Sequence, residues 1–383
     1  MRIKSDVAFV VLIVFITLSS LPRIAFSSDY YVVYELQNHP DGSVNYRLNV
    51  AVSESLREYY AEKSHILVSE NDLAKFVTPY ALKPIANCLR GIYNDDEDLA
   101  NGVLMIVHQI AYEETRPPEY PVETIVADRG DCDLFSYIAA SVLKAGGMEV
   151  VLFYYENEEH MNIGVSLSHE PHSARGTIDY VSYNNTRYYM AECTGGNWQG
   201  GWRVGECPDD LKGASLQVIT LENCEQSAPG QVSASYKVLA SSTASLDVSA
   251  SFLIQGSQVT LSGLLSPSLQ NKTITIYIKA NGLPWSELST VCTDSSGRFK
   301  YVWLADVSGM CYLRANWSGD EDYASADSQI RMITVLPWFL IGLLSLTAIL
   351  VSIGAVAYLM SKHAHSEVSE PQAPEIPSQQ RKL

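Results

Sequence analysis

The stretch "DRGDCDLFSYIAASVLKAGG", residues 128–147, decides the fold of the first half of the chain. Its apolar residues recur at the spacing of a buried helix, and Gly146 and Gly147 supply a helix stop. Cys132 stands at the start of this helix, between two aspartates. A helix start stabilises a thiolate through its free N–H groups and aligned peptide dipoles. Cys132 is therefore either a nucleophile or one half of a disulfide.

The segments around this helix indicate helices first and an antiparallel sheet afterwards. Alternating residues in 30–52 predict a strand pair, and residues 70–93 and 97–114 have apolar side chains at helical spacing. Asn71 and Asp96 or Asp98 are candidate helix caps, and Pro117 with Pro118 a stop. The period then changes to two, in residues 149–156, 160–168, 177–183 and 187–193. This order predicts an α+β fold over residues 29–225.

From about Ser227 the composition shifts to serine, alanine, valine and threonine. Short alternating segments follow one another with turns roughly every ten residues, which is typical of a β-sandwich. We place this second domain at residues 240–335. It contains no catalytic constellation, so we interpret it as a spacer.

Both ends of the chain carry signals for membrane targeting. Residues 1–28 have basic residues, an apolar run and small residues, the layout of a signal peptide. Residues 336–360 are uncharged and exceed the roughly 20 residues that cross a bilayer, which predicts one transmembrane helix. The tail, 361–383, carries Lys362, Arg381 and Lys382 and is expected in the cytoplasm. The sequence thus predicts a single-pass type I protein of the cell membrane, with its body outside the cell.

The chain has a formal net charge of −17, which argues against nucleic acid as a partner. Its seven cysteines are an odd number in a chain routed to an oxidising compartment, so one thiol is expected to stay free. Cys292 and Cys311 fall on two predicted strands of the sandwich and are expected to form a disulfide. The other cysteines apart from Cys132 allow three pairings; they are Cys88, Cys193, Cys207 and Cys224.

A nucleophilic thiol needs a base, and the base needs a group that orients it. His160, in "NEEHMNIGV", opens a predicted strand 28 residues after Cys132. Glu192 lies on a later strand and carries the carboxylate that such an imidazole requires. Each residue also has a structural interpretation: Cys132 in a disulfide, His160 on the surface, and Glu192 solvated beside a bridged Cys193.

Other candidate sites are weaker. His169 and His172, in "HEPH", are metal-binding residue types, but no third ligand lies near them in the sequence. We therefore predict no metal site and no cofactor.

Residues from roughly 70 to 210 resemble the transglutaminase-like domain of the papain-related superfamily. The resemblance covers "YPVETIVADRGDCDLFSYIAASVLKAGGMEVVLFYY", "EHMNIGV" and "YYMAECTGG…GWRVGECP", in the family's order. It implies that Cys132 is the nucleophile, His160 the base and Glu192 the third member, where the family often has aspartate. The stretch "LRANWSGDEDYASADS" is similar to immunoglobulin-like modules of microbial surface proteins.

These observations lead to a membrane-anchored extracellular thiol enzyme that acts on amide bonds through an acyl-enzyme on Cys132. Water as the acceptor makes it a peptidase or amidase, and a protein amine makes it a transglutaminase-type crosslinker. Its expected partners are a protein or peptide substrate at the cell surface and the membrane that holds residues 336–360. The alternative is a non-catalytic binding or adhesion protein that uses the same fold as a scaffold.

Overall fold

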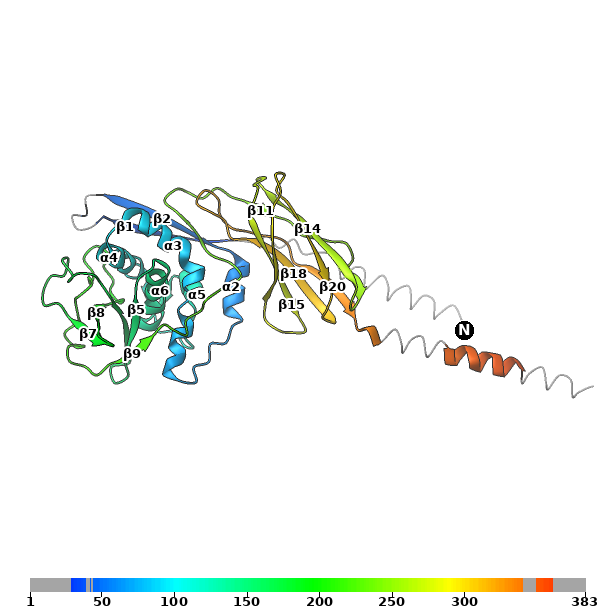
Figure 1. Cartoon of the computed structure of the whole chain (residues 1–383), viewed down its shortest axis with the longest axis horizontal. Helices are drawn as coiled ribbons and strands as arrows, with labels where there is room; N and C mark the ends of the chain where they lie inside the picture. Colours follow the sequence, from blue (N-terminus) through cyan, green and yellow to red (C-terminus); the bar gives the residue numbers. More distant parts are fainter. Residues whose placement is uncertain (1–28, 39–41, 43, 340–348, 361–383) are drawn as a thin grey trace, which may run out of the picture.

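The chain forms a mixed α+β unit followed by a β-sandwich (Figure 1). The structure is a computed structural model that describes residues 29–38, 42, 44–339 and 349–360. The first unit has one large apolar core built from residues between Tyr34 and Ala234, and the sandwich has a separate core between Leu246 and Val335. The predicted signal peptide and cytoplasmic tail lie outside the described residues.

Helices α3, α4 and α5 pack against α6, which is buried along almost its whole length. The bounds of the helices of the first unit are α2 (Glu54–Ala61), η1 (Glu70–Phe76, a 3-10 helix), α3 (Pro79–Ile92), α4 (Asp96–Val107), α5 (Pro121–Ala127) and α6 (Cys132–Ala145). The predicted stop of α6 is confirmed, because Gly146 caps it and Gly147 follows with a φ of 85°.

Two helix predictions need correction. The predicted helix 70–93 is divided at Thr78. Pro79 disfavours a helical conformation of the residue before it, and Pro79 itself is the first residue of α3. The segment 97–114 ends as α4 at Val107, well before Pro117. Its N-cap is Asp95, whose side chain accepts the N–H groups of Glu97 and Asp98.

A five-stranded antiparallel sheet packs against α6. Its strand order is β7-β8-β6-β5-β9. The bounds are β5 (Val150–Tyr155), β6 (His160–Val165), β7 (Tyr180–Tyr183), β8 (Thr186–Ala191) and β9 (Gln217–Thr220). A second sheet joins β1 (Tyr30–Gln37), β2 (Asn45–Val52) and β10 (Ser233–Ser235), so residues beyond 225 complete the first unit.

A short parallel pair lies directly before α6. β3 (Ala111–Tyr112) pairs with β4 (Arg129–Gly130), and Tyr112 lies opposite Gly130. Tyr112 precedes α5 in the sequence, and this pairing brings it next to the residues that lead into Cys132.

The β-sandwich consists of a four-stranded and a six-stranded sheet. The first holds β11 (Thr243–Ala244), β12 (Asp247–Val248), β14 (Gln258–Ser266) and β17 (Arg298–Leu304). The second holds β13 (Phe252–Ile254), β15 (Thr273–Ala280), β16 (Ser286–Cys292), β18 (Gly309–Trp317), β19 (Ala326–Asp327) and β20 (Arg331–Leu336).

The predicted disulfide between Cys292 and Cys311 does not form. Cys292 pairs with Thr273 at one end of β15, and Cys311 pairs with Ala280 at its other end, on the opposite edge. At about 3.3 Å per residue these positions are roughly 20 Å apart along the strand, whereas a disulfide needs Cα atoms within about 7 Å.

The predicted membrane span begins inside the sandwich. Leu336 is the last residue of β20 and pairs with Ile254, so it is not part of a helix. Residues 349–360 are helical and exposed, and residues 340–348 lie outside the described part of the chain. Within the described residues, no helix combines the length and the apolar character that crossing a bilayer requires.

Helix α2 joins the first unit to the sandwich (Figure 1). The buried Asp327 accepts hydrogen bonds from the Ser55 N–H at 2.8 Å, from the Ser55 hydroxyl, and from Asn316 Nδ2 at 3.0 Å. Glu58 lies one turn further along α2, and its Oε2 accepts a hydrogen bond from Arg314 at 2.8 Å. The arginine side chain is only 4% exposed. Charged and polar groups buried in this way are stable only while their partners remain in place.

We expect Asp327→Ala to lower the free energy of unfolding by about 2–4 kcal/mol, because it removes the main acceptor of three buried donors. Chemical denaturation of the full chain measures this, and Asp322→Ala is the matched control. Asp322 forms an exposed pair with Lys237, so its loss is expected to cost no more than about 0.5 kcal/mol. Equal effects of the two changes would contradict this account of the interface.

Candidate active site

Cys132 is the first residue of α6, and the fold fixes its position from two sides. The N-cap Asp131 accepts the Leu134 N–H at 3.4 Å and the Thr115 N–H at 3.0 Å. One turn into the helix, Ser136 donates to the Met161 carbonyl at 3.2 Å, which ties α6 to β6. Cys132 is buried, with 7% of its surface exposed.

His160 and Glu192 form a close pair. His160 is the first residue of β6, and Glu192 follows the last residue of β8, the neighbouring strand. Nε2 of His160 lies 2.9 Å from Glu192 Oε2. Because this hydrogen bond occupies Nε2, Nδ1 is the nitrogen left to exchange a proton.

Glu192 is completely buried, and hydrogen-bond donors surround its carboxylate. Oε2 also accepts from Asn162 Nδ2 at 3.1 Å, and Oε1 accepts from the Thr194 N–H and hydroxyl at 2.8 and 2.6 Å. Burial opposes the charged form, but the bonds from His160 and Thr194 outweigh it and hold the pKa of Glu192 below its usual value. Burial likewise opposes charge on His160, yet Glu192 raises its pKa. The surroundings therefore favour an imidazolium beside a carboxylate.

The thiol of Cys132 touches the backbone on both sides of His160. Its Sγ lies 3.9 Å from the Glu159 carbonyl, and the Met161 N–H acts on it to lower its pKa. Its closest hydrogen-bond acceptor is Asp133 Oδ1, at 3.6 Å. Within the described residues, no direct hydrogen bond joins this thiol to His160. The structure thus places the thiol against the backbone at the start of β6, on either side of His160, and turns it toward Asp133.

The surroundings of Cys132 favour the neutral thiol. Burial raises its pKa to about 12, and the charge on Asp133 adds to this. Burial and the neighbouring Asp131 in turn raise the pKa of Asp133 to about 6. A helix start and an imidazolium favour a thiolate, but here the adjacent carboxylates act in the opposite direction.

Two clefts meet at Tyr112. Cys132 lies in a cleft of about 720 Å³, and His160 lines a neighbouring cleft of about 590 Å³ together with His108, Thr194 and Gly195. Tyr112 lines both clefts and is 61% exposed. Sequence reasoning missed Tyr112, because its two-residue strand gives no periodic signal.

His108 is a second residue that the sequence did not indicate. It caps the C-terminus of α4, and its Nε2 lies 3.1 Å from the Glu192 carbonyl oxygen. The loop after β8 packs tightly against this ring, because a Cβ at Gly201 would lie 2.4 Å from His108 Nδ1. Burial lowers the pKa of His108, which keeps the ring neutral. We interpret His108 as a support for the backbone at Glu192.

All seven cysteines are free thiols. Of the two interpretations of Cys132, a nucleophile or half of a disulfide, the structure therefore does not support the disulfide. Cys193, next to Glu192, is fully buried with its Sγ 3.6 Å from the Ala191 carbonyl, so it is not bridged to Cys207 or Cys224.

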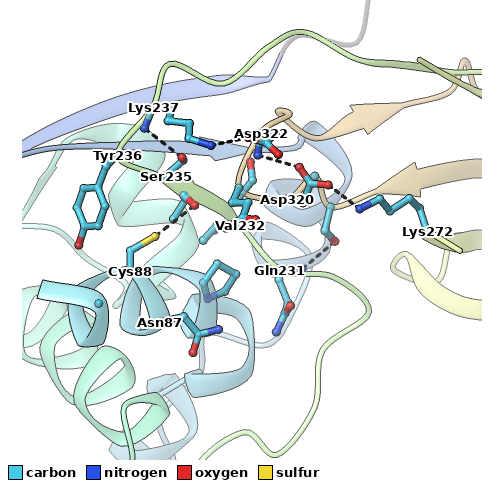
Figure 2. Close-up of a pocket in the computed structure, with 17 residues that line it drawn as sticks. Asn87, Cys88, Gln231, Val232, Ser235, Tyr236, Lys237, Lys272, Asp320 and Asp322 are labelled. Atoms are coloured by element: carbon cyan, nitrogen blue, oxygen red, sulfur yellow. Dashed lines mark hydrogen bonds and ion pairs between the residues drawn. The ribbon is translucent and has the colours of Figure 1, made fainter. Parts of the chain in front are cut away.

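A further cavity of about 600 Å³ lies between α3 and the sandwich (Figure 2). Cys88 borders it and donates to the Ala234 carbonyl at 3.3 Å, while burial raises its pKa to about 11. No histidine is among its lining residues, so this thiol lacks the imidazole partner that Cys132 has nearby. Ion pairs between Lys237 and Asp322 and between Lys272 and Asp320 border the cavity.

No protein-family model matches this sequence, and no curated protein matches it either. Among solved structures, a transglutaminase from red sea bream is 10% identical, with 80% of this chain and 62% of that chain covered, at a TM-score of 0.19. The adhesin InvE of Yersinia pseudotuberculosis is 14% identical, with coverages of 49% and 55% and a TM-score of 0.19.

A chitin binding domain from Burkholderia pseudomallei is 14% identical and matches at a TM-score of 0.18. That match covers 22% of this chain and 55% of the other. At scores this low, all three are distant likenesses of fold and carry no argument about function.

We expect Asp133→Asn to accelerate alkylation of Cys132 by iodoacetamide at neutral pH. Removing the charge of Asp133 lowers the pKa of the thiol. Each pKa unit by which it falls multiplies the thiolate fraction at neutral pH by about ten. Peptide mass spectrometry of the alkylated protein between about pH 6 and pH 11 measures the rate profile. Asp209→Asn, at an exposed site, is the control. A profile that Asp133→Asn leaves unchanged would show that this carboxylate does not govern the thiol.

Proposed function

We propose that this protein is a thiol enzyme that transfers the acyl group of an amide through Cys132. The observation that carries the proposal is the partly buried His160–Glu192 hydrogen bond near a free thiol at a helix start. The resemblance of residues 70–210 to the transglutaminase-like domain supports the same roles.

In this proposal Cys132 Sγ attacks the carbonyl carbon of the amide, and its proton passes to Nδ1 of His160. Glu192 holds Nε2 and stabilises the imidazolium that forms. When the tetrahedral intermediate collapses, the C–N bond breaks and His160 returns the proton to the leaving amine. Water or a primary amine then attacks the thioester with His160 as base, and Cys132 leaves as the thiol.

The developing oxyanion needs donors. Cys132 is the first residue of α6, and the first N–H groups of a helix have no partner within the helix. This places the backbone N–H of Cys132 beside its own thiol, where an oxyanion would form. Tyr112 borders the same cleft and is a candidate side chain for a second donor.

The proposal includes the location of the enzyme. The signal-like residues 1–28 and the apolar run 336–360 support a type I protein whose enzyme domain is outside the cell. The sandwich would then separate that domain from the membrane.

Variants of the proposed triad test the chemistry. We expect Cys132→Ser and His160→Ala each to abolish turnover of a peptide amide, and the double variant to lose little more, because such residues act as a unit. Glu192→Gln is expected to reduce the rate by at least about tenfold, since it removes the charge and places N–H groups against two donors.

Turnover is measured with and without an added primary amine, and circular dichroism confirms that each variant folds. Faster amine incorporation than hydrolysis would decide for crosslinking. A Cys132→Ala protein as active as the unaltered chain would contradict the enzyme function and favour the scaffold alternative.

The charge of the cleft leads to a substrate preference. Its lining carries one cation, Arg116, and the following carboxylates: Glu70, Glu114, Asp131, Asp133, Glu156 and Glu159. Glu70, Glu114, Glu156 and Glu159 form no ion pair within the described residues. A cationic substrate therefore gains attraction here that an acidic one does not.

We expect lysine- or arginine-containing peptides to bind more tightly than glutamate-containing peptides of equal length. Fluorescence anisotropy with the Cys132→Ala chain measures this binding. Glu70→Gln and Glu156→Gln should each weaken cationic binding by up to about fivefold, the range for exposed charge pairs, and added salt should do the same. Glu222→Gln, outside this cleft, is the control. Equal affinity for both peptide classes would contradict the preference.

A further inference from the structure

Two segments that are far apart in the sequence meet at the N-terminus of α4. His169 and His172 lie in the loop between β6 and β7, while Asp95 and Glu97 belong to the N-cap and first turn of α4. Nδ1 of His172 lies 3.7 Å from Glu97 Oε2, and Nδ1 of His169 lies 4.0 Å from the same oxygen. The third ligand that the sequence around "HEPH" lacks is therefore supplied by the fold.

Glu97 is the buried member of this cluster, and its side chain is only 3% exposed. Its Oε2 accepts the His172 N–H at 2.8 Å, and its Oε1 accepts the Ser173 N–H at 2.6 Å. These bonds fix the carboxylate and leave further lone pairs on each oxygen. Within the described residues neither lysine nor arginine pairs with Glu97, so the two imidazoles are the groups that face its charge.

Asp95 contacts one ring nitrogen of His169, and the other ring nitrogen faces the cluster. Asp95 Oδ2 lies 3.1 Å from Nε2 of His169, and a hydrogen bond there keeps the proton on Nε2. Nδ1 then carries the lone pair and faces both Glu97 Oε2 and the Glu170 carbonyl, which is 3.0 Å away. Nδ1, the Glu97 oxygen and the Glu170 carbonyl oxygen then all present lone pairs to the same place. Such an arrangement requires either a proton on Nδ1 or a cation among the three atoms.

The arrangement of the rings suits one ion. The rings of His169 and His172 stack with centroids 4.5 Å apart at 14°. The three candidate ligand atoms lie within 4.8 Å of one another. Tetrahedral zinc has bonds of about 2.0–2.1 Å to nitrogen, which puts its ligands roughly 3.4 Å apart. The two stacked rings must turn for their nitrogens to converge on one ion, and the side chain of His172, 76% exposed, has the room to rotate.

We propose that Glu97, His169 and His172 bind a divalent transition-metal ion of the zinc type, with Asp95 as the positioning residue behind His169. Two imidazole nitrogens and one carboxylate oxygen are ligands that zinc prefers over calcium or magnesium. The ion fixes the β6–β7 loop to α4. The site is distinct from the clefts at Cys132 and His160, because the length of α4 places Glu97 roughly 16 Å from His108.

Calorimetric titration of the full chain with Zn²⁺ tests the proposal, in a Cys132→Ser, Cys292→Ser background that removes the cleft thiol and the exposed thiol. We expect one saturable site and an increase in the unfolding temperature. His169→Ala and His172→Ala should each weaken binding at least tenfold, and Asp95→Asn should weaken it by about tenfold, as for other residues behind a metal ligand. Glu170→Gln, an exposed neighbour with its carboxylate outside the cluster, should bind as the background does.

The imidazole proton resonances provide a second readout that does not depend on stability. Added Co²⁺ should shift or broaden the signals of His169 and His172 before those of His65, and the effect should disappear at low pH, where protons displace the ion. Zn²⁺ affinity that the double variant His169→Ala, His172→Ala leaves unchanged would overturn the proposal. The same holds if Zn²⁺ does not bind and both rings titrate as ordinary imidazoles, since the cluster then holds protons.

Discussion

The burial of α6 is the constraint on which the candidate site depends. Its side chains from Leu134 to Leu143 are all buried among the neighbouring helices and the β5–β6 pair. Each fully buried aliphatic or aromatic side chain contributes about 1.5–3 kcal/mol, so neither rotation nor sliding of this helix is tolerated. Cys132, on the first turn, is therefore held at a fixed point against the start of β6. The site inherits its geometry from a helix that is packed inside the core.

The electrostatics of the site divide into two regions with opposite effects. Beneath the thiol, Glu192 has a donor for each oxygen, and it stabilises positive charge on His160. Around the thiol, Asp133 and the other cleft carboxylates oppose negative charge on sulfur. A bound cationic group would offset that opposition, because it brings an opposite charge next to the developing thiolate. In our proposal, substrate binding and activation of Cys132 are thus linked by charge.

Helix α4 relates the candidate metal site to the candidate active site without joining them. Its first turn supplies Glu97 to the metal cluster, and its C-terminal residue His108 supports the backbone at Glu192. The β6–β7 loop runs from the strand of His160 past the same cluster. An ion there would stabilise the connection between the strands that carry His160 and Glu192, as Asp327 stabilises the contact between the two domains.

The sequence by itself determined the helix that starts at Cys132 and the strands β5 to β8 that follow it. These depend on local periodicity and on punctuation such as Gly146, which act over a few residues. It also indicated that His160 and Glu192 belong with Cys132. Their hydrogen bond, the turn of the thiol toward Asp133, and the completion of the two-histidine motif by Glu97 were decided by tertiary structure alone. Each is a contact between segments whose separation along the chain has no fixed relation to their distance in space, and the strand pairing that kept Cys292 away from Cys311 has the same origin.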